Sequence, residues 1–86
     1  MLKGTTKTGF EFAVEDKALN DMELLEDLSA MSGGDASKLP AVCTRILGHE
    51  QKKRLYEHVR TDGVVPIDKV SLEITEILQS GNQGKN

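Results

Sequence analysis

Apolar residues recur at helical spacing on both sides of Gly48, over residues 39–47 and again over 55–59. Glycine often follows the last residue of a helix, because it adopts left-handed backbone angles that a side chain disfavours. The pattern therefore predicts two helices that meet at Gly48. The first is capped by Asp35 or Ser37 and ends near residue 47, and the second runs from about residue 49 to residue 60.

A third segment with helical period lies earlier in the chain, over residues 21–32. Asn20 is its predicted N-cap, and Glu23 follows three residues later, which is the arrangement of a capping box. The glycines at positions 33 and 34 are expected to end this helix.

A fourth helix is predicted to begin at Pro66, because proline is favoured in the first turn, where its missing N–H is not needed. Its apolar face ends at Leu78, and Leu72 falls off that face. Residues 80–86 are polar and contain glycine, so they are predicted to be a disordered tail. The remaining residues, 1–79, are expected to form a single domain.

Large apolar residues alternate with smaller or polar ones from Phe10 to Val14, which is the period of a β-strand. A lone strand is not stable in water, so this strand must pair with residues 2–6, pair with another chain, or lie over the helices. The expected fold class is mainly α, a compact bundle of about four short helices with a small N-terminal β-strand or hairpin. The predicted core residues are Phe10, Phe12, Val14, Leu24, Leu25, Leu28, Val42, Ile46, Leu55, Val59, Ile67, Val70, Ile74 and Ile77.

Composition limits the classes of function that are open to this chain. Its net charge is −3, and proteins that bind nucleic acid neutralise phosphates with basic residues, so nucleic-acid binding is disfavoured without excluding a local patch. Cys43 is the single cysteine and cannot form an internal disulfide, which fits a reducing cytoplasm. No segment has the length of a membrane span, so no membrane contact is expected.

Candidate catalytic and metal-binding residues are few. Cys43, His49 and His58 are the soft ligands, whereas a structural zinc site needs four ligands with paired spacing. No third residue is evident to orient a Cys–His nucleophile pair. Carboxylates such as Glu73 and Glu76 lie on predicted amphipathic helices, where we expect a solvated face. We therefore expect no catalytic residue, no metal and no cofactor, and we do not expect an enzyme.

The charges of the predicted helices are polarised. Residues 49–60 carry four bases and two carboxylates, whereas residues 21–32 carry four carboxylates and no base. One interpretation is a helix-turn-helix protein that reads DNA with residues 49–60. A second is a surface that docks a protein partner, and a third is a solvated face stabilised by a Glu50–Arg54 pair. The candidate partner-binding residues are Lys52, Lys53, Arg54, Tyr56 and Leu72.

Several segments of this chain carry a resemblance to a known family. TKTGFEF over residues 6–12 is followed by DMELLEDL over 21–28 and by LGHEQKKRLYEHVR over 47–60, and an amphipathic helix opened by Val-Pro comes next. In this order of features the chain resembles the small tail assembly chaperones of long-tailed bacteriophages and prophages of Gram-positive bacteria. The resemblance spans about residues 6–86.

The resemblance implies a function that composition alone does not give. Such chaperones are not enzymes; they bind the tape measure protein, keep it soluble while the tail tube assembles, and are absent from the mature virion. The implied partners are the tape measure protein and the major tail protein, together with self-association, in the cytoplasm of a bacterial host. A longer form made by ribosomal frameshifting is also implied, since Gly84-Lys85-Asn86 can be encoded by a slippery run. The alternative is a small helix-turn-helix DNA-binding regulator that uses residues 49–60.

Overall fold

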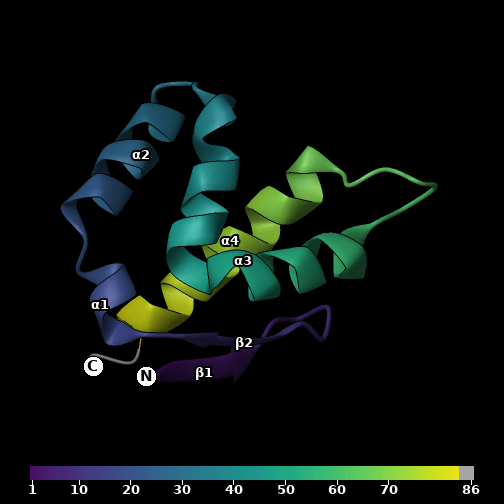
Figure 1. Ribbon diagram of the computed structural model, residues 1–86, viewed down its shortest axis with the longest axis horizontal. Helices are drawn as coiled ribbons and strands as arrows, with labels where there is room; N and C mark the ends of the chain where they lie inside the picture. Colours follow the sequence, from purple (N-terminus) through teal and green to yellow (C-terminus); the bar gives the residue numbers. More distant parts are fainter. Residues whose placement is uncertain (84–86) are drawn as a thin grey trace.

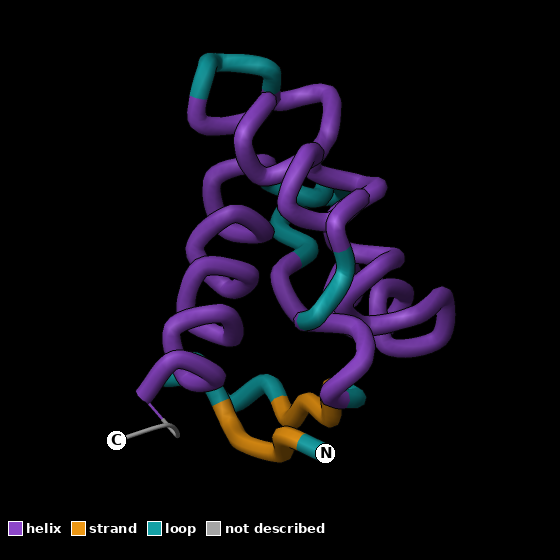
Figure 2. The backbone as a smooth tube through the Cα atoms, turned by 90° about the vertical axis from the view of Figure 1, so that its left-hand side faces the viewer, coloured by secondary structure: helices purple, strands orange, loops and turns teal. Residues whose placement is uncertain are grey.

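The computed structural model describes residues 1–83, and these residues form an N-terminal β-hairpin followed by four α-helices (Figure 1). The predicted fold class, mainly α with a small N-terminal β-element, is confirmed. Figure 2 shows the hairpin across one end of the helical part. The elements are β1 (Leu2–Thr5), β2 (Glu11–Val14), α1 (Asp16–Leu19), α2 (Met22–Ser32), a short 3₁₀ helix (Ala36–Lys38), α3 (Leu39–Val59) and α4 (Ile67–Gln83).

The partner of the predicted strand is the N-terminal segment of the same chain. Strands β1 and β2 are antiparallel, with Leu2 opposite Val14. Phe10, Phe12 and Val14 are all buried, so the apolar face predicted from their alternation is the face that packs on the helices. The hairpin therefore belongs to the core of the domain.

The outer edge of β2 is closed by a side chain of α3 instead of a third strand. The Gln51 Nε2 group donates to the Ala13 carbonyl oxygen over 2.7 Å, and the Gln51 Oε1 atom accepts from the Ala13 backbone N–H over 2.8 Å. Nε2 also donates to the Leu47 carbonyl oxygen over 2.8 Å, one helical turn earlier. Because a two-stranded hairpin is marginal by itself in water, these bonds help to hold it on α3.

Helix α2 begins one residue later than predicted, with Asp21 instead of Asn20 as its N-cap. The Asp21 carboxylate accepts from the Glu23 backbone N–H over 2.9 Å, which satisfies one of the free donors of the first turn. Asn20 instead follows α1, a single helical turn that was not predicted. A helix of four residues has too few apolar positions to show a period, so no pattern marks it.

The predicted break at Gly48 is confirmed, although the two helical segments of α3 follow one another without a loop. Gly48 has φ 77° and ψ 170°, a conformation that residues with a side chain rarely adopt. The bend turns the second half of α3 across the hairpin (Figure 1). The prediction that Asp35 or Ser37 caps this helix is wrong, because the N-cap of α3 is Lys38, which makes no side-chain capping bond. Asp35 instead caps the short 3₁₀ helix, where its carboxylate accepts from the Ser37 N–H over 3.1 Å.

The buried core contains most of the predicted residues and corrects two of them. Leu25 and Ile67 are 59% and 68% exposed, because Leu25 lies on the outer side of α2 and Ile67 is the first residue of α4. Leu28 is partly buried against the core. Helix α3 contacts α2, α4 and β2 at once, so more of its circumference is apolar than a single stripe predicts. The buried apolar residues that the prediction omitted are Leu39, Cys43 and Leu47.

Helix α4 continues to Gln83, so the prediction of a disordered tail is wrong for residues 80–83. Gly81 lies against the N-terminal elements, since a Cβ there would be 3.2 Å from the Leu19 side chain and 3.4 Å from that of Leu2. This packing supports a helical end whose serine and glycine disfavour a helix by propensity. Residues 84–86 of the predicted tail lie outside the described residues.

Gly48→Ala is expected to lower the free energy of unfolding by about 1–3 kcal/mol, because alanine is strained at these backbone angles. Urea unfolding followed by circular dichroism measures the difference. The matched control is Gly33→Ala, since Gly33 has φ −80° and a Cβ there would meet its nearest atom at 3.4 Å. Equal destabilisation by the two substitutions would contradict a backbone requirement at Gly48.

Gln51→Ala is expected to destabilise the domain by about 1–3 kcal/mol, because it leaves the Ala13 N–H and C=O without their side-chain partner in a partly buried place. The same urea unfolding measures the change. Gln79→Ala is the control, since Gln79 is an exposed residue of α4. If both alanine variants were equally stable, apolar packing alone would hold the hairpin.

Candidate functional site

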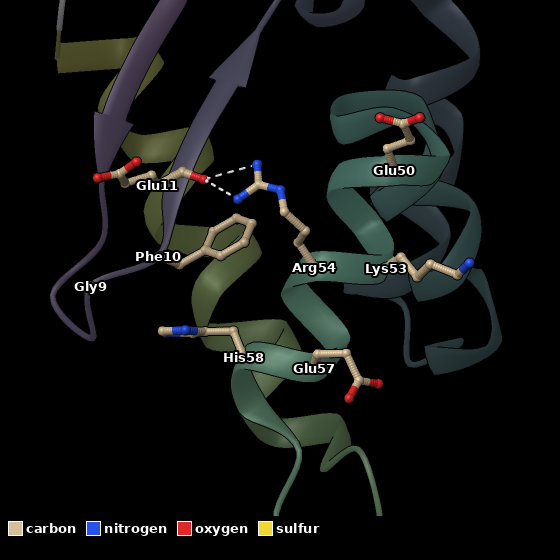
Figure 3. Close-up of a pocket in the computed structure, with 8 residues that line it drawn as sticks. All are labelled: Gly9, Phe10, Glu11, Glu50, Lys53, Arg54, Glu57 and His58. Carbon is tan, nitrogen blue, oxygen red and sulfur yellow. Dashed lines mark hydrogen bonds between the residues drawn. The ribbon is translucent and has the colours of Figure 1, made fainter.

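Two grooves flank the second half of α3, and the hairpin forms one wall of each. The hairpin groove has a volume of about 860 Å³ and is drawn in Figure 3. The α4 groove, of about 640 Å³, lies between the hairpin tip, the end of α3 and α4. His58 lines both grooves. The residues that line the hairpin groove are Gly9, Phe10, Glu11, Glu50, Lys53, Arg54, Glu57 and His58.

The five predicted partner-binding residues do not form one patch. Lys53 and Arg54 line the hairpin groove, and Leu72 lines the α4 groove. Lys52 and Tyr56 line neither of these two grooves, and the Lys52 Nζ atom lies 5.9 Å from the centroid of the Tyr56 ring. Successive residues of a helix point in different directions, so side chains adjacent in sequence are separated in space.

Arg54 is engaged within the chain instead of being a free cation. Both of its terminal nitrogens donate to the Glu11 carbonyl oxygen over 3.4 Å, and its guanidinium carbon lies 5.3 Å from the centroid of the Phe10 ring. The predicted Glu50–Arg54 pair is not among the ion pairs of the described residues, and Figure 3 shows Glu50 pointing away from Arg54. Arg54 thus attaches the hairpin to α3.

Carboxylates balance the cations of the hairpin groove, whose lining contains three acids and two bases. One of these acids, Glu57, accepts from Arg60 over 2.7 Å, and this hydrogen bond lowers the pKa of the Glu57 carboxyl. The segment that is basic in sequence is therefore not a basic surface in space. The charged residues concerned are Glu11, Glu50, Glu57, Lys53 and Arg54.

The acidic character of α2 is offset by Arg45 of α3. The Arg45 Nε group donates to the Asp27 carboxylate over 2.9 Å, and this bond is the main cause that raises the pKa of Arg45. Its Nη1 atom lies 3.5 Å from a carboxylate oxygen of Glu23 and 3.7 Å from one of Asp21. The separation of charge along the sequence is therefore reduced where the two helices meet.

The α4 groove contains polar contacts that fix the hairpin tip to α4. The Thr8 hydroxyl donates to Glu73 Oε2 over 2.8 Å, and its oxygen lies 3.0 Å from Nε2 of His58. The Lys7 backbone N–H donates to the Glu76 carboxylate over 2.8 Å. Three elements that are distant in sequence meet at this point, so no sequence pattern could have paired them.

Glu73 corrects the prediction that the carboxylates of this helix form a solvated face, because it is only 4% exposed. It lies on the buried stripe of α4 together with Val70, Ile74 and Ile77, at helical spacing. Its position on an apolar stripe is the sequence feature that could have indicated its burial. A carboxylate is seldom buried unless it is paired, so the same position also implies a hydrogen-bond partner.

Cys43 is a core residue. Burial raises the pKa of its thiol to about 11, and the positive charge of Lys52 acts in the opposite direction. The Lys52 ammonium itself donates to Thr44 Oγ1 over 2.9 Å, so it too has a partner within the chain. At neutral pH the Cys43 thiol is therefore protonated as well as hidden from solvent.

The described part of the chain contains neither a cluster of metal ligands nor a membrane-spanning helix. Within residues 1–83, no three His, Cys, Asp or Glu side chains gather where they could hold a metal ion. None of the helices described there combines the length and the apolar character needed to cross a membrane.

No protein-family model, no curated protein and no solved structure matches this chain.

Proposed function

We propose that this chain is a non-enzymatic tail assembly chaperone of a long-tailed bacteriophage or prophage, which binds the tape measure protein and keeps it soluble while the tail tube assembles. The resemblance of residues 6–12, 21–28 and 47–60 to that family motivates the proposal. The observation that carries it is the α4 groove, which opens beside the side chain of Leu72, 69% exposed.

The α4 groove suits an amphipathic helix. Leu72 and Val59 provide apolar surface, and Lys69, Glu73 and Glu76 provide charged groups at the same place. A helix laid in such a groove buries one apolar face and keeps its polar face in water. Burying a leucine side chain contributes about 1.5–3 kcal/mol, so Leu72 is the residue whose loss should weaken binding most.

Other exposed apolar side chains allow the chain to contact a client at more than one place. Met22 and Leu25 are 68% and 59% exposed on α2. Val64 is 62% exposed just before α4, and Ile67 is 68% exposed as its first residue. An aggregation-prone client is kept soluble when its apolar surface is covered by many weak contacts. Several copies of the chain along one client would provide them, and self-association of those copies forms part of the proposal.

The resemblance also implies where and when the chain acts. It works in the cytoplasm of the bacterial host. It contacts the major tail protein when the growing tail tube displaces this chain from the tape measure protein, and it is absent from the finished virion. A longer form made by frameshifting carries a second module. These statements follow from the resemblance.

The alternative function, a helix-turn-helix DNA-binding regulator, is favoured by one observation, the break at Gly48 between two helical segments. The balance of charge disfavours it. Three carboxylates line the groove beside residues 49–60, and Arg54 is bound to the hairpin. Phosphates would meet these carboxylates as well as the remaining cation Lys53.

Co-expression with the tape measure protein of the same locus tests the proposal. We expect this chain to raise the soluble fraction of the tape measure protein several-fold and to elute with it. Leu72→Asp is expected to reduce the recovered complex at least about fivefold, because it places a charge in the apolar contact. Leu25→Asp is the control, since both leucines are exposed and neither change should unfold the domain.

Equal recovery with the two aspartate variants would reject the α4 groove as the contact. Absence of rescue by the 86-residue chain and by its frameshifted form would reject the chaperone function. Affinity for random duplex DNA that falls steeply with salt and is lost in Lys53→Glu would then support the regulator.

A further inference from the structure

One oxygen of the Glu73 carboxyl group has no hydrogen-bond partner within the described residues. The Oε2 atom accepts from the Thr8 hydroxyl over 2.8 Å, whereas the Oε1 atom is buried and accepts nothing. The residue is 4% exposed and its Oε1 atom is buried, so bulk solvent does not reach that atom. Buried polar atoms are nearly always paired, because an unpaired one loses its hydration without compensation.

No donor of the described residues forms a hydrogen bond with the Glu73 Oε1 atom. Lys69 lies one helical turn before it, yet the Lys69 Nζ group donates to Thr61 Oγ1 over 3.3 Å. The Lys7 backbone N–H donates to Glu76. Within the described residues, the groups that line the α4 groove therefore leave an acceptor open in a place that also contains apolar surface.

We infer that the α4 groove holds a subsite for a basic side chain, lysine or arginine, presented by a helix of the partner. The apolar stem of that side chain lies along Leu72 and Val59, and its ammonium or guanidinium group donates to Glu73 Oε1. Glu76, one turn further along α4, provides a second negative charge near the same basic group. The nature of the partner rests on the proposed function, whereas the subsite rests on the groove itself.

Entry of the basic group requires a rearrangement of the rim of the groove, because Oε1 is covered. Lys69 and Leu72 line the groove and are exposed, so their side chains can change rotamer at little energetic cost. The lining also contains Lys7, and the two lysines balance the two carboxylates. Recognition therefore depends on a local charge-assisted hydrogen bond, and not on the long-range field of the protein.

Two small probes that share a stem test the subsite directly on the ¹⁵N-labelled full chain. Hexylammonium carries the donor and hexanol provides the same stem without charge. We expect hexylammonium to bind at about millimolar concentration and at least about fivefold more tightly than hexanol, because only its charged head pairs with Glu73. The amide shift changes should centre on Thr8, Leu72 and Glu73.

Glu73→Gln removes the carboxylate and keeps an acceptor for Thr8, and it is expected to reduce the preference for hexylammonium to less than about twofold. Glu57→Gln in the hairpin groove is the matched control and should keep the preference. Equal binding of the two probes to the wild-type chain, or shift changes away from the α4 groove, would overturn the subsite without reference to any variant. A preference that survives in Glu73→Gln would overturn it too.

The probes contain no client, so the subsite and the chaperone function can fail separately. A preference for hexylammonium without rescue of the tape measure protein keeps the subsite and rejects the function. Rescue without that preference keeps the function and rejects the subsite.

Discussion

The pair of hydrogen bonds between the Gln51 side chain and the Ala13 backbone is the contact on which both grooves depend. It substitutes for a third strand at the edge of β2 and holds the hairpin against the second half of α3. Each groove uses the hairpin as a wall, so neither would keep its shape if the hairpin detached. Burial of Phe12 and Val14 supplies the apolar part of the same attachment.

The bend at Gly48 makes this contact possible, because it turns α3 so that one half packs on α2 and the other crosses the hairpin (Figure 1). The side chains of charged residues also connect the elements by ion pairs and hydrogen bonds. Arg45 joins α3 to α2, and Arg54 joins α3 to the hairpin. The apolar core of a domain of this size is small. Hydrogen bonds and ion pairs between elements therefore contribute more to fixing the arrangement of the helices and the hairpin than they would in a larger domain.

Local patterns predicted the fold well, and contacts between distant segments were the part they could not give. The periodicity around Gly48 and the alternation from Phe10 to Val14 gave the break and the buried strand face, since both depend on neighbours in sequence. The predicted end of α4 was wrong, because the packing of Gly81 on Leu2 and Leu19 overrides the low helix propensity of the residues there. The helical spacing of Glu73 with buried apolar residues could have indicated its burial, whereas its partner Thr8 comes from a distant segment that no local pattern could identify. Leu72 was the only candidate residue that lines the α4 groove.

The α4 groove is the surface that we propose contacts the client. Hydrogen–deuterium exchange of this chain, alone and with the soluble tape measure protein, tests it most directly. We expect added protection at the hairpin tip and along α4 around Leu72, with exchange in α2 unchanged. Protection confined to α2, or to residues 49–54 of α3, would contradict it.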